Sequence, residues 1–280
     1  MKKFLAVLLT AVMAIACCLG LTACGETSND TVVNPRTKNI IVGYTDYAPM
    51  NYEENGVLKG FDTELAIMTF EALGYNVEFK LITWKNKYLD LNANRIDCIW
   101  NGFTANGEDD GQSRDTLVDF SAYYMQNAQC IVRKSTTPEI NNKQGFAGMS
   151  IAFENGSSGE SLANSYKKGD ANDTSDDINI ITTGCSDQMS AITRVNTGLS
   201  DYAIVDVILA QTVLQGQGYS SLVINTGLTI DVEYYAVGFK KGSELTAKVN
   251  TMFKAFAETG VLQQLASKYK LSTAVLTNFN

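Results

Sequence analysis

Short apolar runs alternate with amphipathic segments along the first part of the chain. Ile40–Gly43 is an apolar run of strand length, and residues 61–73 repeat apolar side chains at helical spacing. Val77–Leu81 alternates polar and apolar residues, residues 84–93 form a second helical pattern, and Ile96–Trp100 is a further apolar run. This βαβαβ order predicts a parallel sheet with helices on its faces.

The middle of the chain repeats the same order. Its expected strands are residues 128–133, 149–153, 178–181 and 202–205, and its expected helices are residues 158–166, 187–196 and 207–214. A last strand at 234–239 and two helices on either side of Gly260 close the chain. The two units predict two lobes, and the closing elements, which have no sheet of their own, are expected to dock on one of them.

The first residues have the pattern of an export signal. Met1–Ala23 begins with two lysines, continues with an apolar stretch and ends in small residues, as a secretory signal peptide does. The segment Leu21-Thr22-Ala23-Cys24-Gly25 resembles a bacterial lipobox, which implies cleavage before Cys24 and a lipid on its thiol. A cleaved signal with an incidental cysteine, or an uncleaved anchor helix, are the alternatives. Residues 24–38 are mostly polar without an apolar period, so we expect a flexible tether there.

The charge of the chain is acidic, with 22 Lys and Arg against 30 Asp and Glu and a net charge of -8. Removal of Met1–Ala23 takes away two lysines and no acids, which makes the charge -10 (-8 minus 2). An acidic surface argues against nucleic acid as a partner. No second apolar run has the length of a membrane span.

Cysteine and histidine usage narrows the chemistry. After the signal and Cys24, three cysteines remain at 98, 130 and 185, which leaves one disulfide with an odd thiol, or three thiols, open. The chain has no histidine, which removes Ser-His-Asp and Cys-His catalysis and most zinc sites. Phosphate-binding glycine loops are absent too, so we expect no metal and no cofactor.

The stretch Asp97–Ser121 holds the main candidate for binding chemistry. The strand that ends near Trp100 is followed by Thr104 and later by a lone arginine, Arg114. Ligands bind at the carboxyl ends of strands in open α/β sheets, and a guanidinium fork matches the two oxygens of a carboxylate. An ordinary surface arginine on a loop is the alternative.

Several motifs taken in their order resemble a known family, the polar amino-acid substrate-binding proteins of bacterial ABC importers. The residues that carry the resemblance cover roughly Asn39 to Leu271 and are Gly43 with Tyr47-Ala48-Pro49-Met50-Asn51-Tyr52, Gly60-Phe61-Asp62, Ile96-Asp97, Trp100-Asn101-Gly102-Phe103-Thr104, Arg114 with Val118-Asp119-Phe120-Ser121, Gly156-Ser157-Ser158, Asp201 to Asp206, and Tyr235 to Leu245. Each motif is modest alone, and their order and spacing make the likeness specific.

The resemblance implies a two-lobe α/β fold of the type II periplasmic-binding-protein class, with a hinge and mixed, mainly parallel sheets. Lobe 1 would comprise residues 39–124 and 235–280, and lobe 2 residues 125–234, with crossing segments near 124–127 and 229–234. The implied protein is a monomer that is lipid-anchored outside the cytoplasm. It captures a polar amino acid between its lobes and delivers it to an ABC permease, and it is not an enzyme.

The same resemblance implies a set of ligand-binding residues. Arg114 would hold the ligand α-carboxylate together with Asn101, Gly102, Thr104 and Ser158, and Asp206 would pair with the α-ammonium. Tyr47 and Trp84 would enclose the ligand side chain. For the two aromatics the alternative is a place in the core, for Asp206 a helix N-cap, and for Thr104 an ordinary loop position.

Three departures from the family pattern leave questions open. Met50 replaces the usual phenylalanine after Pro49, and residues 105–113 form an insert of unknown course between Thr104 and Arg114. Glu154 either points into the side-chain pocket, where it favours a cationic or amide side chain, or points outward. A dehydratase-like enzyme on the same fold, with Glu154 or Asp206 as general acid or base, is the alternative function.

Overall fold

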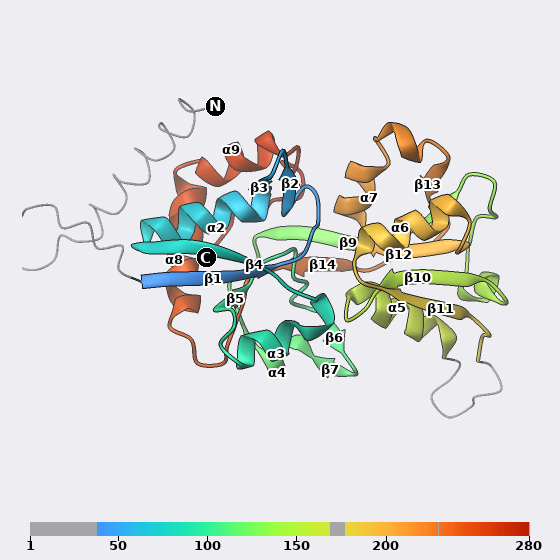
Figure 1. Ribbon diagram of the computed structural model, residues 1–280, viewed down its shortest axis with the longest axis horizontal. Coiled ribbons are helices and arrows are strands. Elements are labelled where there is room, and N and C mark those ends of the chain that lie inside the picture. Colours follow the sequence, from blue (N-terminus) through green and yellow to red (C-terminus); the bar gives the residue numbers. More distant parts are fainter. Residues whose placement is uncertain (1–37, 169–176, 229, 280) are drawn as a thin grey trace, which may run out of the picture.

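The computed structural model describes residues 38–168, 177–228 and 230–279, which form two α/β lobes side by side (Figure 1). The expected signal peptide, the lipid site at Cys24 and most of the tether lie outside the described residues. Within the described ranges, no helix is both long enough and apolar enough to cross a membrane.

The first lobe is built on a five-stranded sheet in the order β4-β1-β5-β15-β8. The strands are Tyr75–Leu81 (β4), Lys38–Tyr44 (β1), Cys98–Ile99 (β5), Gly238–Phe239 (β15) and Asp119–Phe120 (β8). The pairings of β1 are parallel, and β15 is antiparallel to both of its neighbours. The sheet is therefore mixed, because β15, which comes from the C-terminal part of the chain, runs antiparallel to its two neighbours.

Helices and two short hairpins surround this sheet. They are α2 (Phe61–Ala72), η1 (Trp84–Asn86), α3 (Lys87–Asn92), α4 (Arg114–Leu117), α8 (Leu245–Glu258) and α9 (Val261–Lys268), with the hairpins β2–β3 (Tyr52–Glu54, Val57–Lys59) and β6–β7 (Glu108–Asp109, Gln112–Ser113). The C-terminal helices α8 and α9 pack beside α2, so the closing elements dock on the first lobe (Figure 1).

The second lobe contains a sheet in the order β11-β10-β12-β9-β13. The strands are Ile181–Cys185 (β11), Ser150–Glu154 (β10), Tyr202–Asp206 (β12), Met125–Lys134 (β9) and Leu222–Ile224 (β13). Its helical segments are η2 (Lys143–Phe146), α5 (Ser158–Lys167), α6 (Gln188–Thr197), α7 (Val207–Val213) and η4 (Gln217–Tyr219). Parallel pairing of β10 with β11 and β12, and antiparallel pairing of β9, again make the sheet mixed.

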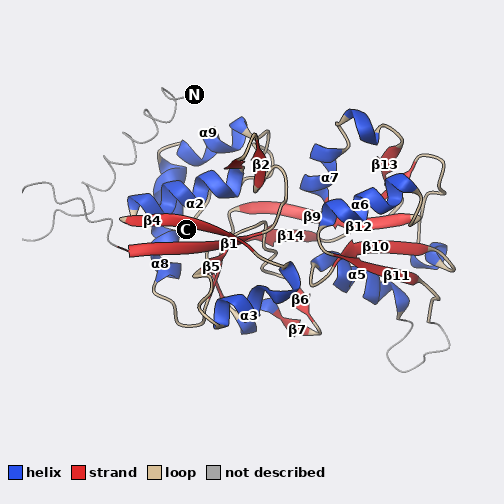
Figure 2. Cartoon of the chain, in the orientation of Figure 1, coloured by secondary structure: helices blue, strands red, loops and turns tan. Residues whose placement is uncertain are grey.

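Two antiparallel strands connect the lobes, β9 and β14 (Val232–Tyr235), and both lie between them in Figure 2. Their register pairs Met125 with Tyr235 and Ala128 with Val232, after which β9 continues into the second sheet. Residues 125–127 of β9 and 232–234 of β14 fall within the segments near 124–127 and 229–234 that the resemblance implies as crossings. The chain therefore passes between the lobes along this pair of strands.

Two expected strands differ from the structure. Residues 178–181 are not a strand, because β11 begins at Ile181, while Ile178 and Ile180 pack into the core of the second lobe. The regular strand therefore starts three residues later than expected, although the Asn179 carbonyl already accepts from the Gly148 amide at 2.7 Å. The strand expected at 234–239 is split into β14 and β15, where the chain passes from the connection into the first sheet.

The three cysteines of the described chain are free and buried, so the disulfide alternative is wrong.

A buried carboxylate ties α2 to the loop after β5. Asp62 lies in the first turn of α2, and its Oδ2 accepts hydrogen bonds from the Gly102 amide (2.7 Å) and the Tyr124 hydroxyl (2.9 Å). Burial raises the pKa of Asp62 to about 7, against the opposing effect of these donors. The contact fixes the backbone of Gly102, which lies in the site described next.

Candidate functional site

The nine residues singled out in the sequence line one cavity between the lobes. Its walls are Tyr47, Trp84, Asn101, Gly102, Thr104 and Arg114 from the first lobe, and Glu154, Ser157, Ser158, Gln188 and Asp206 from the second. Only about 10 Å³ is open to the centre of a water molecule, room for roughly one water. A solute larger than a water molecule does not fit this cavity in this arrangement of the two lobes.

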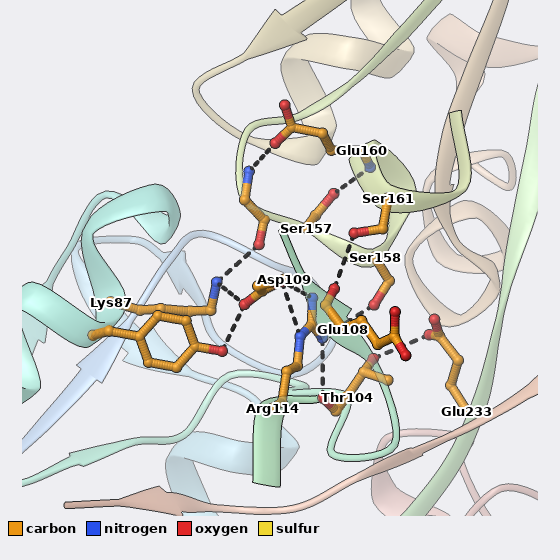
Figure 3. Close-up of polar contacts among 12 residues, drawn as sticks. Lys87, Thr104, Glu108, Asp109, Arg114, Ser157, Ser158, Glu160, Ser161 and Glu233 are labelled. Carbon is orange, nitrogen blue, oxygen red and sulfur yellow. Dashed lines mark hydrogen bonds and ion pairs between the residues drawn. The ribbon is translucent and has the colours of Figure 1, made fainter. Parts of the chain in front are cut away.

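Arg114 is buried, with 1% of its surface exposed, and is not the surface arginine of the alternative interpretation. Its Nη1 donates to the Thr104 carbonyl (3.0 Å) and, across the two lobes, to the Ser158 hydroxyl (3.1 Å). Its Nε and Nη2 donate to Asp109 Oδ1 at 3.1 and 2.7 Å (Figure 3). The residue reaches the predicted place, but the protein itself already occupies most of its N–H groups.

The insert folds as the hairpin β6–β7, which answers how residues 105–113 bring Thr104 and Arg114 together. The Gly107 carbonyl accepts from the Arg114 amide at 3.0 Å, which closes the insert on itself. On the far side, the Glu108 carbonyl accepts from the Ser161 hydroxyl of α5 at 3.0 Å. The hairpin therefore belongs to the first lobe and contacts the second.

Residues 101–104, which follow β5, form part of the cavity wall, but their side-chain donors are bonded to other protein groups. The Asn101 amide is used internally, because it donates to the Thr45 carbonyl and to Asn51 Oδ1 at 2.9 and 2.8 Å. At Gly102 the backbone has φ +55, and a Cβ there would lie 2.5 Å from the Tyr47 ring, so only glycine fits. The Thr104 hydroxyl donates to Glu233 (3.0 Å), so its backbone carbonyl, and not its hydroxyl, contacts Arg114.

The two aromatics have core contacts and also form the cavity wall. The Tyr47 hydroxyl lies 2.7 Å from the Tyr235 hydroxyl, and the Trp84 ring meets the Phe103 ring edge-on at 5.3 Å. Both rings are at least nine-tenths buried. Core and cleft are therefore not exclusive alternatives for these residues.

The second lobe contributes the carboxylates. Glu154, at the end of β10, points inward; it is 3% exposed, lines the cavity, and its Oε1 has no hydrogen-bond partner among the described residues. Ser157 caps α5 by accepting from the Glu160 amide (3.3 Å), which leaves Ser158 facing Arg114. An unpaired buried carboxylate oxygen is costly, so a donor on a ligand is favoured there.

Asp206 stands at the N-cap position of α7, but its side chain makes no capping bond. Its two oxygens accept from Asn127 (2.8 Å), Gln129 (2.5 Å) and Gln188 (2.6 Å). Asn127 and Gln129 also donate to Glu233 of β14. Asp206 therefore occupies the N-cap position of α7, but its carboxylate does not cap the helix.

Burial and neighbouring charges shift the acidity of these groups. Desolvation and the nearby Glu233 charge raise the pKa of Asp206 to about 7, although its three amide donors lower it. Desolvation, with the Asp206 charge, also raises the pKa of Glu154 well above its ordinary value. Within the described part of the chain no cluster of three or more acids and cysteines has the arrangement of a metal site.

Five polar residues at or beside this site were not predicted from the sequence, namely Lys87, Asp109, Ser157, Gln188 and Glu233. Gln188 follows a recognisable helix cap, Asp187, but nothing in the sequence shows that its amide meets Asp206. Asp109 lies in an acidic insert, and Lys87 in an amphipathic helix, where both residue types are ordinarily exposed.

Comparison with known proteins places this geometry in a family. The family model for bacterial extracellular solute-binding proteins, family 3, matches residues 40–272. The arginine-binding extracellular protein ArtP of Bacillus subtilis (strain 168) is 27% identical over 276 residues, which cover 96% of this chain and 98% of that protein. The L-cystine-binding protein TcyA of the same organism is 25% identical over 286 residues, with 96% and 97% covered.

Solved structures agree with the sequence relatives. A substrate-binding protein of an ABC uptake transporter from Streptococcus pneumoniae with bound histidine has a TM-score of 0.70 and 27% identity, covering 82% of this chain and 92% of its own. The arginine-, lysine-, histidine-binding protein ArtJ of Geobacillus stearothermophilus has a TM-score of 0.71 and 26% identity, covering 83% and 95%. These likenesses confirm the predicted type II fold.

Proposed function

Because the chain belongs to the bacterial extracellular solute-binding proteins of family 3, we propose that it binds a free amino acid between its lobes and delivers it to an ABC permease. The observation that carries this proposal is the placement of opposite charges across one closed cavity, with Arg114 on the first lobe and Asp206 on the second. A zwitterion that leaves water needs a partner for each charge. This cavity offers both.

The side chain of the ligand is proposed to be polar and to carry a hydrogen-bond donor. Glu154 presents an unpaired oxygen to the cavity, and Trp84 and Tyr47 supply ring surface on which a cationic or amide group can lie. The relatives named as arginine- and cystine-binding proteins are consistent with a ligand of this kind.

A panel of amino acids tests the ligand class by thermal unfolding. We expect arginine, lysine, histidine, glutamine or cystine to raise the melting temperature most, and aspartate and glutamate to leave it unchanged. A ligand that binds only the folded protein adds about 2.7 kcal/mol at a hundredfold excess over its Kd. Stabilisation by acidic amino acids alone would contradict the proposed role of Glu154.

We propose further that the protein is held outside the cytoplasm by a lipid on Cys24, after removal of Met1–Ala23. The lipobox-like segment supports this anchoring, and a lipidated soluble domain stays near the permease that it serves. In cells, Cys24→Ser is expected to move the protein from the membrane fraction to the medium or periplasm. Equal membrane retention of both forms would argue for an uncleaved anchor helix.

An enzyme is the second candidate, because Glu154 combines burial with a raised pKa, as a general acid requires. An ancestral amino-acid-binding protein described as a precursor of cyclohexadienyl dehydratase shares the fold, with a TM-score of 0.69 and 24% identity. Chemical conversion of a bound ligand distinguishes the two functions.

A further inference from the structure

Asp109 of the hairpin β6–β7 is a buried link between two cations. Its Oδ1 accepts from Arg114, and its Oδ2 lies 3.0 Å from Lys87 Nζ and accepts from the Tyr88 hydroxyl at 2.6 Å (Figure 3). Four donor atoms thus hold one carboxylate. Asp109 is fixed in place and is already the partner of the arginine that is proposed to grip the ligand.

Lys87 is the least expected member of this group. It is the first residue of α3, yet only 1% of its surface is exposed. Its Nζ donates to the Gly156 carbonyl of the second lobe at 2.9 Å and lies 5.1 Å from the Trp84 ring centroid. The ammonium is therefore buried beside the cavity wall, at the end where Arg114 and Ser158 meet.

The N–H groups of Arg114 show how little of it is free. A guanidinium has five N–H groups. The contacts to Asp109, the Thr104 carbonyl and Ser158 use Nε, one N–H of Nη2 and both of Nη1. Among the described residues a single N–H remains without a partner, and the charge of Arg114 is already balanced by Asp109. Without another cation this end of the cavity would be neutral and would attract a carboxylate weakly.

We propose that Lys87, Asp109 and Arg114 together form the carboxylate subsite. The negative charge of Asp109 balances that of Arg114, and Lys87 supplies the remaining net charge of +1. The subsite thereby takes one monoanionic carboxylate. Asp109 positions the guanidinium through its Nε edge, and Lys87 acts at a distance through its charge. This inference rests on the proposed amino-acid binding and names the residues that set its charge balance.

Two neutralising substitutions separate charge from structure. Lys87→Met makes the subsite neutral, so we expect the affinity for the best ligand of the panel to fall by roughly tenfold or more at low effective dielectric. The double variant Lys87→Met, Asp109→Asn restores a net charge of +1 through Arg114 and should bind more tightly than Lys87→Met alone. Calorimetric titration of each purified protein measures both affinities.

The control Lys248→Met makes the same change in formal charge on the exposed surface of α8, and should bind as the unaltered protein does. If the double variant binds as weakly as Lys87→Met or more weakly, the residues act only through packing and the inference is overturned. If Lys87→Met does not fold, Lys87→Gln takes its place. Failure of the unaltered protein to bind any amino acid refutes the proposed function itself and not this charge balance.

The dependence of affinity on pH gives a readout that packing does not move. Burial and the Arg114 charge lower the pKa of Lys87 to about 8, while the charges of Asp109 and of Glu154 on β10 support its charged form. The Tyr88 ring, 4.6 Å from Lys87 Nζ, is a further titratable neighbour. Lys87 therefore loses its proton as the pH rises through 8, and the subsite becomes neutral. Between pH 7 and pH 9 the affinity of the unaltered protein should fall more steeply than that of Lys87→Met. Parallel curves would overturn the inference.

Discussion

Replacing Arg114 by alanine is expected to weaken the binding of every amino acid that the protein takes, by between roughly 30-fold and several thousand-fold. The estimate corresponds to about 2–5 kcal/mol for truncating one partner of a buried charge pair. The physical reason is that the ligand carboxylate loses both a donor and a positive charge, while Asp109 remains and cancels the charge of Lys87. Calorimetric titration measures the loss, and circular dichroism checks the fold.

Two further variants sharpen this prediction. Arg114→Lys keeps the charge and loses the planar fork, so its affinity should lie between those of the unaltered protein and Arg114→Ala. Arg95→Ala removes a guanidinium that is 53% exposed and paired with Asp90 on the surface, and it should bind normally. Intact affinity in folded Arg114→Ala would place the carboxylate subsite elsewhere.

Replacing Asp206 by asparagine is expected to have the second large effect, a loss of roughly 30-fold or more in affinity, because the ligand ammonium would lose its buried counter-charge. Asparagine keeps the volume of Asp206 and, at Oδ1, the acceptor for the amides of Asn127 and Gln129, and only Gln188 loses its acceptor at Oδ2. The fold should therefore survive, and the defect should appear in binding.

The pH profile of the same variant tests the assigned charge. The pKa of Asp206 is raised to about 7, so below that pH the free protein holds a proton that the ligand ammonium has to displace. The affinity of the unaltered protein should fall as the pH is lowered from 7.5 to 5.5, by up to about tenfold per unit. Asp206→Asn should lack this limb, whereas Asp115→Asn, on the surface, should retain it. An identical slope in all three proteins would remove Asp206 from the ammonium contact.

The free energy of unfolding also depends on the ionisation of Asp206. In the unfolded chain Asp206 ionises at its ordinary pKa near 4, so the folded protein without ligand loses free energy of unfolding as the pH rises from about 4 through 7. A ligand that pairs with the ionised carboxylate removes this penalty. Stabilisation by ligand should consequently be larger at pH 7.5 than at pH 5.5.

Much of the fold was predictable because burial leaves a periodic record in the sequence. The helical spacing of residues 61–73 and the alternation of Val77–Leu81 correspond to α2 and β4. The strand expected at 178–181 begins only at Ile181, because the buried Ile180 and the half-buried Ile178 pack into the core from a loop, and apolar side chains alone do not distinguish a strand from such a loop.

The site was predictable as far as the order of motifs reached. Arg114, Ser158 and Asp206 come from separate segments, and the family resemblance alone assigned them to one place, where the structure brings them together. The order of motifs did not predict that Asp109 and Lys87 lie beside the site. Asp109 meets Arg114 through the hairpin, which turns at Asp110 and Gly111, both with positive φ, and the buried Lys87 ammonium is paired with Asp109 and with the Gly156 carbonyl.

Native mass spectrometry of the purified protein mixed with the common amino acids and cystine is the most direct test of binding without conversion. We expect one added mass per chain that equals an intact amino acid, and a much smaller fraction of this complex for Arg114→Ala under the same conditions. Absence of a complex with any amino acid, or recovery of a ligand whose mass has changed during incubation, would contradict a binding protein that holds its ligand between the two lobes.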